Sequence, residues 1–223
     1  MVNGDSKINM IDFIEMNKMV EIGKVKVVKE LVSKALKEGA SASDILNKGL
    51  LPGMNAVGEK FKNNEVYIPE VLISARALNN GVNLLKPLLS AGDVEKPGIA
   101  VIGTVHGDLH DIGKNLVKMM LESKGIEVID LGVDVTAEQF ISTAKEKGAK
   151  VICCSTLLTT TMPEMENVVN EAEAQGIRDD LFIMIGGAPT SEEFSRKIGA
   201  DCYTMDAASA ADAALSWLQK KTT

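Results

Sequence analysis

The chain has 223 residues, of which 45% are hydrophobic and 25% charged, as in an ordinary globular protein of one or two domains. The formal net charge of −7 argues against nucleic-acid binding, which needs clustered Lys and Arg. No apolar run approaches the roughly 20 residues that span a bilayer. The three cysteines lack the number and the spacing of a disulfide framework or a structural zinc site. With no signal peptide, a cytoplasmic protein is expected.

Residues 1–90 have the apolar spacing of packed helices. Apolar residues recur every three or four positions, as in Met16 and Val20 and again in Val28 and Val32. A third helix is expected from Ser43, with a bend at Pro52, and a fourth from Pro69 to Leu89, since proline suits a first turn. The pattern therefore predicts a four-helix bundle.

The apolar pattern changes after residues 91–98, which contain two glycines and one proline and are interpreted as a linker. Residues 99–223 alternate short apolar runs with helical segments. The expected strands lie at 99–102, 128–131, 151–154, 181–185 and 202–203, with helices at 114–124, 137–146 and 162–174 among others. This order predicts an α/β domain with a doubly wound, Rossmann-like and flavodoxin-like parallel five-stranded sheet. Ligands of such domains bind beyond the carboxyl ends of the strands.

Both histidines of the protein lie in the loop after the first expected strand. The glycines of this loop fit neither a P-loop nor a dinucleotide fingerprint. His110 with Asp108 two residues before it suits a metal-bound imidazole whose second nitrogen donates to a carboxylate. The same residues also fit a helix start capped by Asp108 or Asp111, a zinc site of His106, Asp108 and His110, or a general base.

Two later loops carry further polar or glycine residues at expected strand ends. Residues 155–162 read Ser-Thr-Leu-Leu-Thr-Thr-Thr-Met, with more hydroxyl groups than capping one helix requires. The surplus hydroxyls suit a ligand edge or a hydrogen-bond relay from Asp108. Gly186 and Gly187 allow the backbone to approach a turn or a flat ligand closely.

Together these loops resemble the cobalamin-binding signature of the methionine synthase class. The matching residues are Asp108-x-His110-x-x-Gly113, then Ser155-x-Leu157 after 41 residues, then Gly186-Gly187 after a further 28. Residues 53–61 and 67–71 resemble the helical cap domain that precedes the cobalamin domain in that class. With only these two domains, the chain resembles a free-standing corrinoid protein of the methylamine, methanol, betaine or aryl-ether methyltransferase systems.

The resemblance implies a non-catalytic subunit that carries a methyl group on the cobalt of a cobalamin or related corrinoid. The subunit would accept the group as cobalt(I) from a substrate-specific methyltransferase. It would donate it as methylcobalt(III) to a second methyltransferase, whose acceptor is coenzyme M or tetrahydrofolate. A reductive activase is a further implied partner. Neither a nucleic acid nor a membrane is expected as a partner.

The resemblance also assigns site residues. His110 would be the lower axial cobalt ligand, Asp108 would hold its other nitrogen, and Thr161, at the place of the family's serine, would complete a proton relay. The other residues implied in cofactor binding are Gly107, Leu109, Asp111 and Gly113 around the ligand, Ser155, Leu157 and Thr159 along the nucleotide-tail channel, Gly186, Gly187 and Ala207 near its nucleotide end, and Phe61, Ile68 and Val71 in the cap.

Two other corrinoid functions and one fallback remain as alternatives. A corrinoid-dependent sensor or regulator would normally add an output domain, for which the chain has no spare length. The small subunit of an adenosylcobalamin mutase would lack the helical region of residues 1–90. Without the resemblance, a flavodoxin-like domain that binds a metal or a phosphate would remain.

Overall fold

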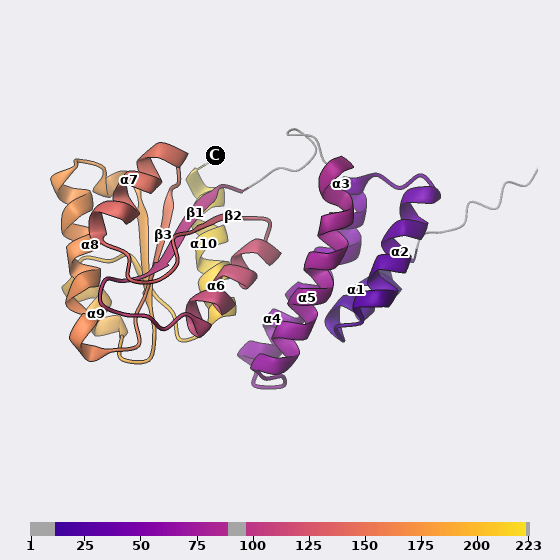
Figure 1. Ribbon diagram of the computed structural model, residues 1–223, viewed down its shortest axis with the longest axis horizontal. Coiled ribbons are helices and arrows are strands. Elements are labelled where there is room, and N and C mark those ends of the chain that lie inside the picture. The colour runs from indigo at the N-terminus through magenta and orange to yellow at the C-terminus, as the bar shows by residue number, and fades with distance from the viewer. Residues whose placement is uncertain (1–11, 89–96, 222–223) are drawn as a thin grey trace, which may run out of the picture. The chain divides into compact units, whose positions relative to one another are not determined.

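The chain forms two compact units that divide after Glu95, and the computed structural model describes residues 12–88 and 97–221 (Figure 1). The first unit is helical and the second is α/β. The division falls within the segment interpreted as a linker, of which residues 91–96 lie outside the described residues.

The helical unit contains the helices that its apolar spacing predicts. Its elements are α1 (Phe13–Glu21), α2 (Val25–Lys37), α3 (Ala42–Asp44), η1 (Ile45–Leu50), α4 (Leu51–Lys62), α5 (Ile68–Leu85) and η2 (Lys86–Leu88). Met16, Val20, Val28 and Val32 are all buried, as their periodicity requires. The prediction of a helical N-terminal region is confirmed.

The bend expected near Pro52 is a change of hydrogen-bond pattern. Proline has no N–H to donate to the carbonyl four residues before it. The chain responds with the π-helix η1, in which Leu51 N donates to the Leu46 carbonyl. The freed Lys48 carbonyl accepts a hydrogen bond from Asn17 Nδ2 at 2.8 Å, which joins α1 to the bend.

The α/β unit is built on five parallel strands in the order β2-β1-β3-β4-β5. The strands are β1 (Ile99–Thr104), β2 (Glu127–Asp130), β3 (Val151–Ser155), β4 (Phe182–Gly186) and β5 (Cys202–Tyr203). The central strands β1 and β3 consist almost wholly of buried residues, which explains their continuous apolar runs. The predicted five-stranded parallel sheet is confirmed.

Helices cover both faces of this sheet (Figure 1). On one side α6 (Ile112–Ser123) packs against α10 (Ala207–Lys221), and on the other α7 (Ala137–Lys147) packs against α8 (Pro163–Ala174). The remaining elements are α9 (Glu192–Lys197) and the 3-10 turns η3 (Thr159–Thr161) and η4 (Arg178–Asp180). The sheet is therefore covered on both faces, and its carboxyl edge, where the strands give way to loops, bears the residues singled out in the sequence.

Candidate functional site

The three loops singled out in the sequence begin side by side at one edge of the sheet. The last residue of β1, Thr104, is in register with Ser155 of β3, which is in register with Gly186 of β4. The loops that follow these residues therefore start from adjacent strand ends, although 82 residue numbers separate Thr104 from Gly186. This is the place where α/β sheets bind ligands.

A tight turn after β1 directs Asp108 into the protein. Gly107 has a φ of +79°, a left-handed conformation that glycine adopts without steric cost. Asp108 N then donates to the Val105 carbonyl at 3.1 Å, and the Asp108 side chain is fully buried. The loop returns to the strand where Thr104 Oγ1 donates to the His110 carbonyl at 2.8 Å.

The buried carboxylate of Asp108 is surrounded by hydrogen-bond donors. Oδ1 accepts the His110 backbone N–H at 3.0 Å and lies 2.7 Å from His110 Nδ1. Oδ2 accepts Thr156 Oγ1 at 2.8 Å and Leu157 N at 2.7 Å. Burial raises the pKa of Asp108, but the hydrogen bonds from His110, Leu157 and Thr156 outweigh it and hold the pKa well below its usual range.

This arrangement determines which nitrogen of His110 is available to a ligand. An ionised carboxylate only accepts hydrogen bonds, so Nδ1 of the neutral imidazole carries the hydrogen and Nε2 keeps its lone pair. The His110 side chain is 53% exposed, while its carboxylate partner is buried. An exposed imidazole fixed in this way through Nδ1 is suited to ligate a metal through Nε2.

Two buried threonines stand behind Asp108. Thr161 Oγ1 lies 3.4 Å from Asp108 Oδ2, while Thr156 Oγ1 lies between them, 2.6 Å from Thr161 Oγ1. Sequence reasoning named Thr161 and missed Thr156, which directly donates to the carboxylate. The sequence signal for Thr156 was its position directly after a buried strand, within a run of hydroxyl residues.

The two neighbouring glycines at the end of β4 differ in their surroundings. A Cβ atom on Gly187 would lie 1.7 Å from the Thr156 carbonyl oxygen, so the second glycine permits contact between two loops. A Cβ atom on Gly186 would have no neighbour within 4 Å, and the same is true of Gly113 in the first turn of α6. These two glycines therefore leave room for further atoms next to their backbone.

The loops at this edge also expose large apolar side chains. Leu109 is 71% exposed and Ile112 is 72% exposed, and both lie next to the histidine loop. Leu157, Leu158 and Met205, on the loops after β3 and β5, are exposed as well. Exposed apolar groups around a polar histidine suit an amphipathic ligand with a metal at its centre.

The structure places the remaining predicted residues of the α/β unit as follows. Asp111 occupies the N-cap position of α6, and its carboxylate accepts Asn115 Nδ2 at 2.9 Å. Ser155 ends β3 and is half-buried, and Thr159 is exposed in η3. Ala207 is buried in the first turn of α10.

The three predicted cap residues differ in exposure. Ile68, at the start of α5, is 41% exposed, and Phe61, on α4, is half-buried. Val71 is fully buried in α5, so it contributes to the core and has no surface to offer a cofactor. Leu72, next to it on α5, is exposed.

Among the alternatives for the histidine loop, a helix start at Asp111 matches the N-cap position of that residue, whereas capping by Asp108 and the zinc site do not fit this geometry. Asp108 cannot cap α6 from outside, because it is buried and its carboxylate binds His110, Thr156 and Leu157. A zinc site would need His106 beside His110, but His106 Nδ1 lies 2.7 Å from Asp134 Oδ1. Within residues 12–88 and 97–221, no three His, Cys, Asp or Glu side chains are grouped to hold a metal ion.

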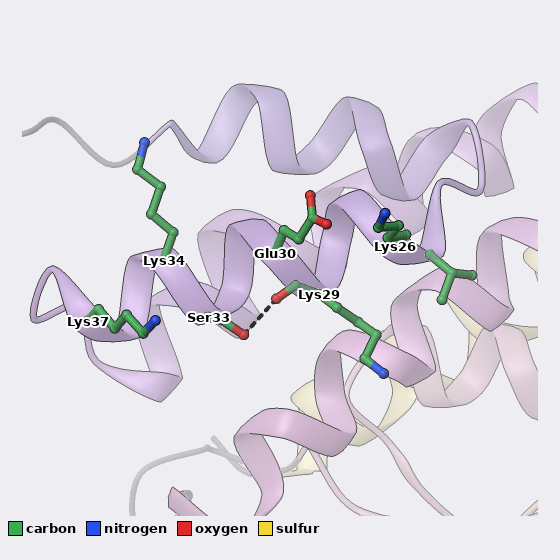
Figure 2. Close-up of a pocket in the computed structure, with 7 residues that line it drawn as sticks. Lys26, Lys29, Glu30, Ser33, Lys34 and Lys37 are labelled. Atoms are coloured by element: carbon green, nitrogen blue, oxygen red, sulfur yellow. Dashed lines mark hydrogen bonds between the residues drawn. The ribbon is translucent and has the colours of Figure 1, made fainter.

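The helical unit has a separate surface feature, a shallow groove along α2 (Figure 2). Its lining residues are Val25, Lys26, Lys29, Glu30, Ser33, Lys34 and Lys37. All belong to α2, whose opposite face buries Val28, Val32 and Ala35. The lysines are therefore the solvated side of an amphipathic helix, and the groove has neither the histidine nor the glycines of the first site.

Comparisons with known proteins show which families and relatives this chain is similar to. Two B12 binding domain family models match the chain, one over residues 98–216 and the other over residues 16–86. The chain is 44% identical to dimethylamine corrinoid protein 1 of Methanosarcina acetivorans, over 75% of this chain and 79% of that protein.

Two solved structures of cobalamin-related proteins are also similar to this chain. One is the methanol:cobalamin methyltransferase complex MtaBC from Methanosarcina barkeri, with a TM-score of 0.84 and 26% identity over 96% of this chain and 81% of the matched chain. The other is a cobalamin-binding protein from Desulfitobacterium hafniense, with a TM-score of 0.77 and 31% identity over 92% of this chain and 98% of that one. As for a membrane, none of the described helices combines the length and apolar character that crossing one requires.

Proposed function

The chain belongs to the corrinoid proteins of the methylamine and methanol methyltransferase systems, and we propose that it carries a methyl group on the cobalt of a corrinoid held by His110. One observation carries the ligand assignment. The Nδ1 atom of His110 is 2.7 Å from a buried carboxylate, while the imidazole itself is half-exposed. Nε2 is thus the nitrogen offered to the metal.

The residues of the chain control the ligand, while the corrinoid, when bound, supplies the cobalt centre that gains and gives up the methyl group. Asp108 orients the imidazole and accepts the hydrogen of its Nδ1 atom. Thr156 and Thr161 hold the second oxygen of Asp108 in place. We assign these three side chains to a relay that keeps the Nδ1 proton of His110 within the protein.

The surrounding residues are assigned to cofactor binding by their place in the fold. Ser155, Leu157 and Thr159 would line a channel for the nucleotide tail, with Gly186, Gly187 and the start of α10 at Ala207 near its end. Leu109 would contact the corrin beside the ligand. Phe61 and Ile68 of the helical unit would cover the upper face and exclude water from it.

The proposed partners are two methyltransferases and an activase. A substrate-specific methyltransferase would deliver the methyl group, and a second enzyme would pass it to coenzyme M or tetrahydrofolate. A reductive activase would restore oxidised cobalt. Support for a methyltransferase partner comes from the related structure, which is a complex of a methanol:cobalamin methyltransferase.

The test is reconstitution with hydroxocobalamin. The purified chain should retain the pigment through desalting and show the absorption spectrum of histidine-ligated cobalt. His110→Ala should lose the histidine-ligated spectrum. His106→Ala is the matched control, since it removes the other imidazole of the same loop, and it should keep that spectrum. A colourless wild-type protein would disprove corrinoid binding, and an unchanged spectrum in His110→Ala would remove His110 as the ligand.

A further inference from the structure

A second aspartate holds the histidine loop from outside the buried network. Asp134 lies in the loop between β2 and α7 and is half-exposed. Its Oδ1 accepts the Gly107 N–H at 2.8 Å, and its own N–H donates to the Asp108 carbonyl at 3.0 Å. Asp134 therefore binds the backbone of the two residues that immediately precede Leu109 and His110.

The backbone conformation of Asp134 is one that few residue types adopt. Its φ is +58°, and it is one of only two non-glycine residues with a left-handed backbone in the described part of the chain. Apart from glycine, residues other than Asn and Asp rarely adopt this backbone conformation. In this conformation the carboxylate of Asp134 accepts from Gly107 while its N–H donates to Asp108, so both hydrogen bonds form together.

The segment that carries Asp134 is itself fixed to the sheet. Beyond the end of β2, Thr104 N donates to the Gly132 carbonyl and Val135 N donates to the Thr104 carbonyl, both at 3.0 Å. Val105 and Val135 form an isolated parallel bridge. Asp134 is thus a rigid support against which the turn at Gly107 rests.

From these contacts we propose that Asp134 is a positioning residue for the axial ligand. It fixes the backbone of Gly107 and Asp108, so that the Asp108 side chain stays inserted against Thr156 while His110 remains at the surface. This inference rests on the proposed role of His110. The Gly107 N–H and the nearby His106 also lower the pKa of Asp134, so its carboxylate is an ionised and strong acceptor.

The ion pair between His106 and Asp134 is not the part that positions the loop. Both side chains are at least half-exposed, at 56% and 50%. Exposed pairs of this kind contribute little. The contacts that matter are those to the backbone at 107 and 108, which His106→Ala leaves in place.

Three substitutions at Asp134 separate the contributions. Asp134→Gly keeps the left-handed backbone and the N–H but loses the acceptor for Gly107. Asp134→Asn keeps an acceptor oxygen and tolerates the backbone conformation. Asp134→Ala loses the acceptor and also strains the backbone. Each variant is loaded with hydroxocobalamin, and its fold is checked by circular dichroism.

The readout is the histidine-ligated fraction, from the absorption spectrum and from the nitrogen hyperfine splitting in the electron paramagnetic resonance of the cobalt(II) form. Asp134→Gly and Asp134→Ala should shift the ratio of ligated to unligated histidine by about tenfold, as expected for one lost charge-assisted hydrogen bond. Asp134→Asn keeps a neutral acceptor and should shift the ratio less than Asp134→Gly does, while His106→Ala should stay near wild type. Wild-type ratios in both Asp134→Gly and Asp134→Ala would overturn this inference alone. A wild type without a histidine-ligated spectrum would instead overturn the proposed function.

Discussion

Gly186 and Gly187 are adjacent glycines, but the structure predicts that an alanine at Gly187 impairs folding and an alanine at Gly186 impairs cofactor binding. Gly187→Ala should destabilise the protein by at least about 3 kcal/mol, because the new methyl group would collide with a backbone oxygen and φ is +124°. Gly186→Ala should fold normally, since its Cβ meets nothing within 4 Å. If the corrinoid occupies that space, Gly186→Ala should bind it about tenfold more weakly.

Urea unfolding measures the first effect, and titration with hydroxocobalamin measures the second. Each variant is the control for the other. Undiminished corrinoid affinity in Gly186→Ala would mean that the open space at Gly186 lies outside the cofactor site.

Thr156 is the second residue whose role can be separated by substitution. Thr156→Val keeps the shape of the side chain but removes one of the donors to Asp108 Oδ2, which should cost about 1–3 kcal/mol. Thr156→Ser keeps the hydroxyl and loses one methyl group, at about 0.8 kcal/mol. The free energy of unfolding in urea distinguishes them, with the exposed Thr160→Val as a control near zero. Equal losses in the valine and serine variants would contradict a hydrogen-bonding role.

These residues also show how far sequence reasoning reaches at a site. His110, Asp108 and the two glycines were singled out because their spacing forms a recognisable pattern. Thr156 and Asp134 were missed because their roles depend on a close approach of loops 26 or more positions apart along the chain. Val71 was assigned to the cap from a local motif, whereas its burial depends on how α5 packs.

At the level of elements, a buried ion pair joins α6 to the end of β2. Lys114 Nζ lies 2.6 Å from Asp130 Oδ1, with side chains only 3% and 21% exposed, and Lys118 contacts the other oxygen at 3.1 Å. Asp130→Asn leaves the cation of Lys114 buried without its charge partner. The variant should therefore lose about 3 kcal/mol of stability at neutral pH.

The same pair predicts a pH dependence. Burial raises the pKa of Asp130, but Lys114, the Gly132 N–H and Lys118 outweigh it and lower the pKa below its usual value. A carboxyl group with a lowered folded pKa stabilises fully above its unfolded pKa of about 3.9, and this stabilisation is lost as the pH falls through the folded value. Urea unfolding at several pH values should show the difference between wild type and Asp130→Asn shrinking below about pH 4. The exposed Asp179→Asn should match wild type throughout, and a difference that stays constant in acid would refute the assignment.

Helices and strands were predictable where the apolar pattern of the sequence is strong. They were less predictable where the local backbone hydrogen bonds determine the conformation. The buried strands β1 and β3 were located within about two residues because parallel strands covered on both faces have continuous apolar runs. The bend near Pro52 was expected, but its π-helical form was not. In that form, Asn17 of another helix donates a hydrogen bond to the Lys48 carbonyl, which proline leaves free.

For the whole molecule, the proposed function assigns cofactor binding and cofactor protection to different units. Every residue of the histidine site belongs to the α/β unit, whereas the proposed cap belongs to the helical one. A fragment of residues 97–223, shown to be folded by circular dichroism, should therefore take up hydroxocobalamin with the same histidine-ligated spectrum as the full chain. Loss of binding in a folded fragment would mean that the helical unit contributes to cofactor affinity.

The fragment and the full chain should differ in how fast reduced cobalt is oxidised. Phe61 and Ile68 are absent from the fragment, so water and oxygen would reach the upper face freely. On mixing with air-saturated buffer, stopped-flow absorbance should show several-fold faster oxidation in the fragment than in the full chain. The full-length variant Ile68→Asp, exposed in the helical unit and so expected to fold, should be shifted towards the fragment. Equal oxidation rates in all three proteins would contradict the cap, while His110 ligation would be unaffected, because ligation and exclusion belong to different units.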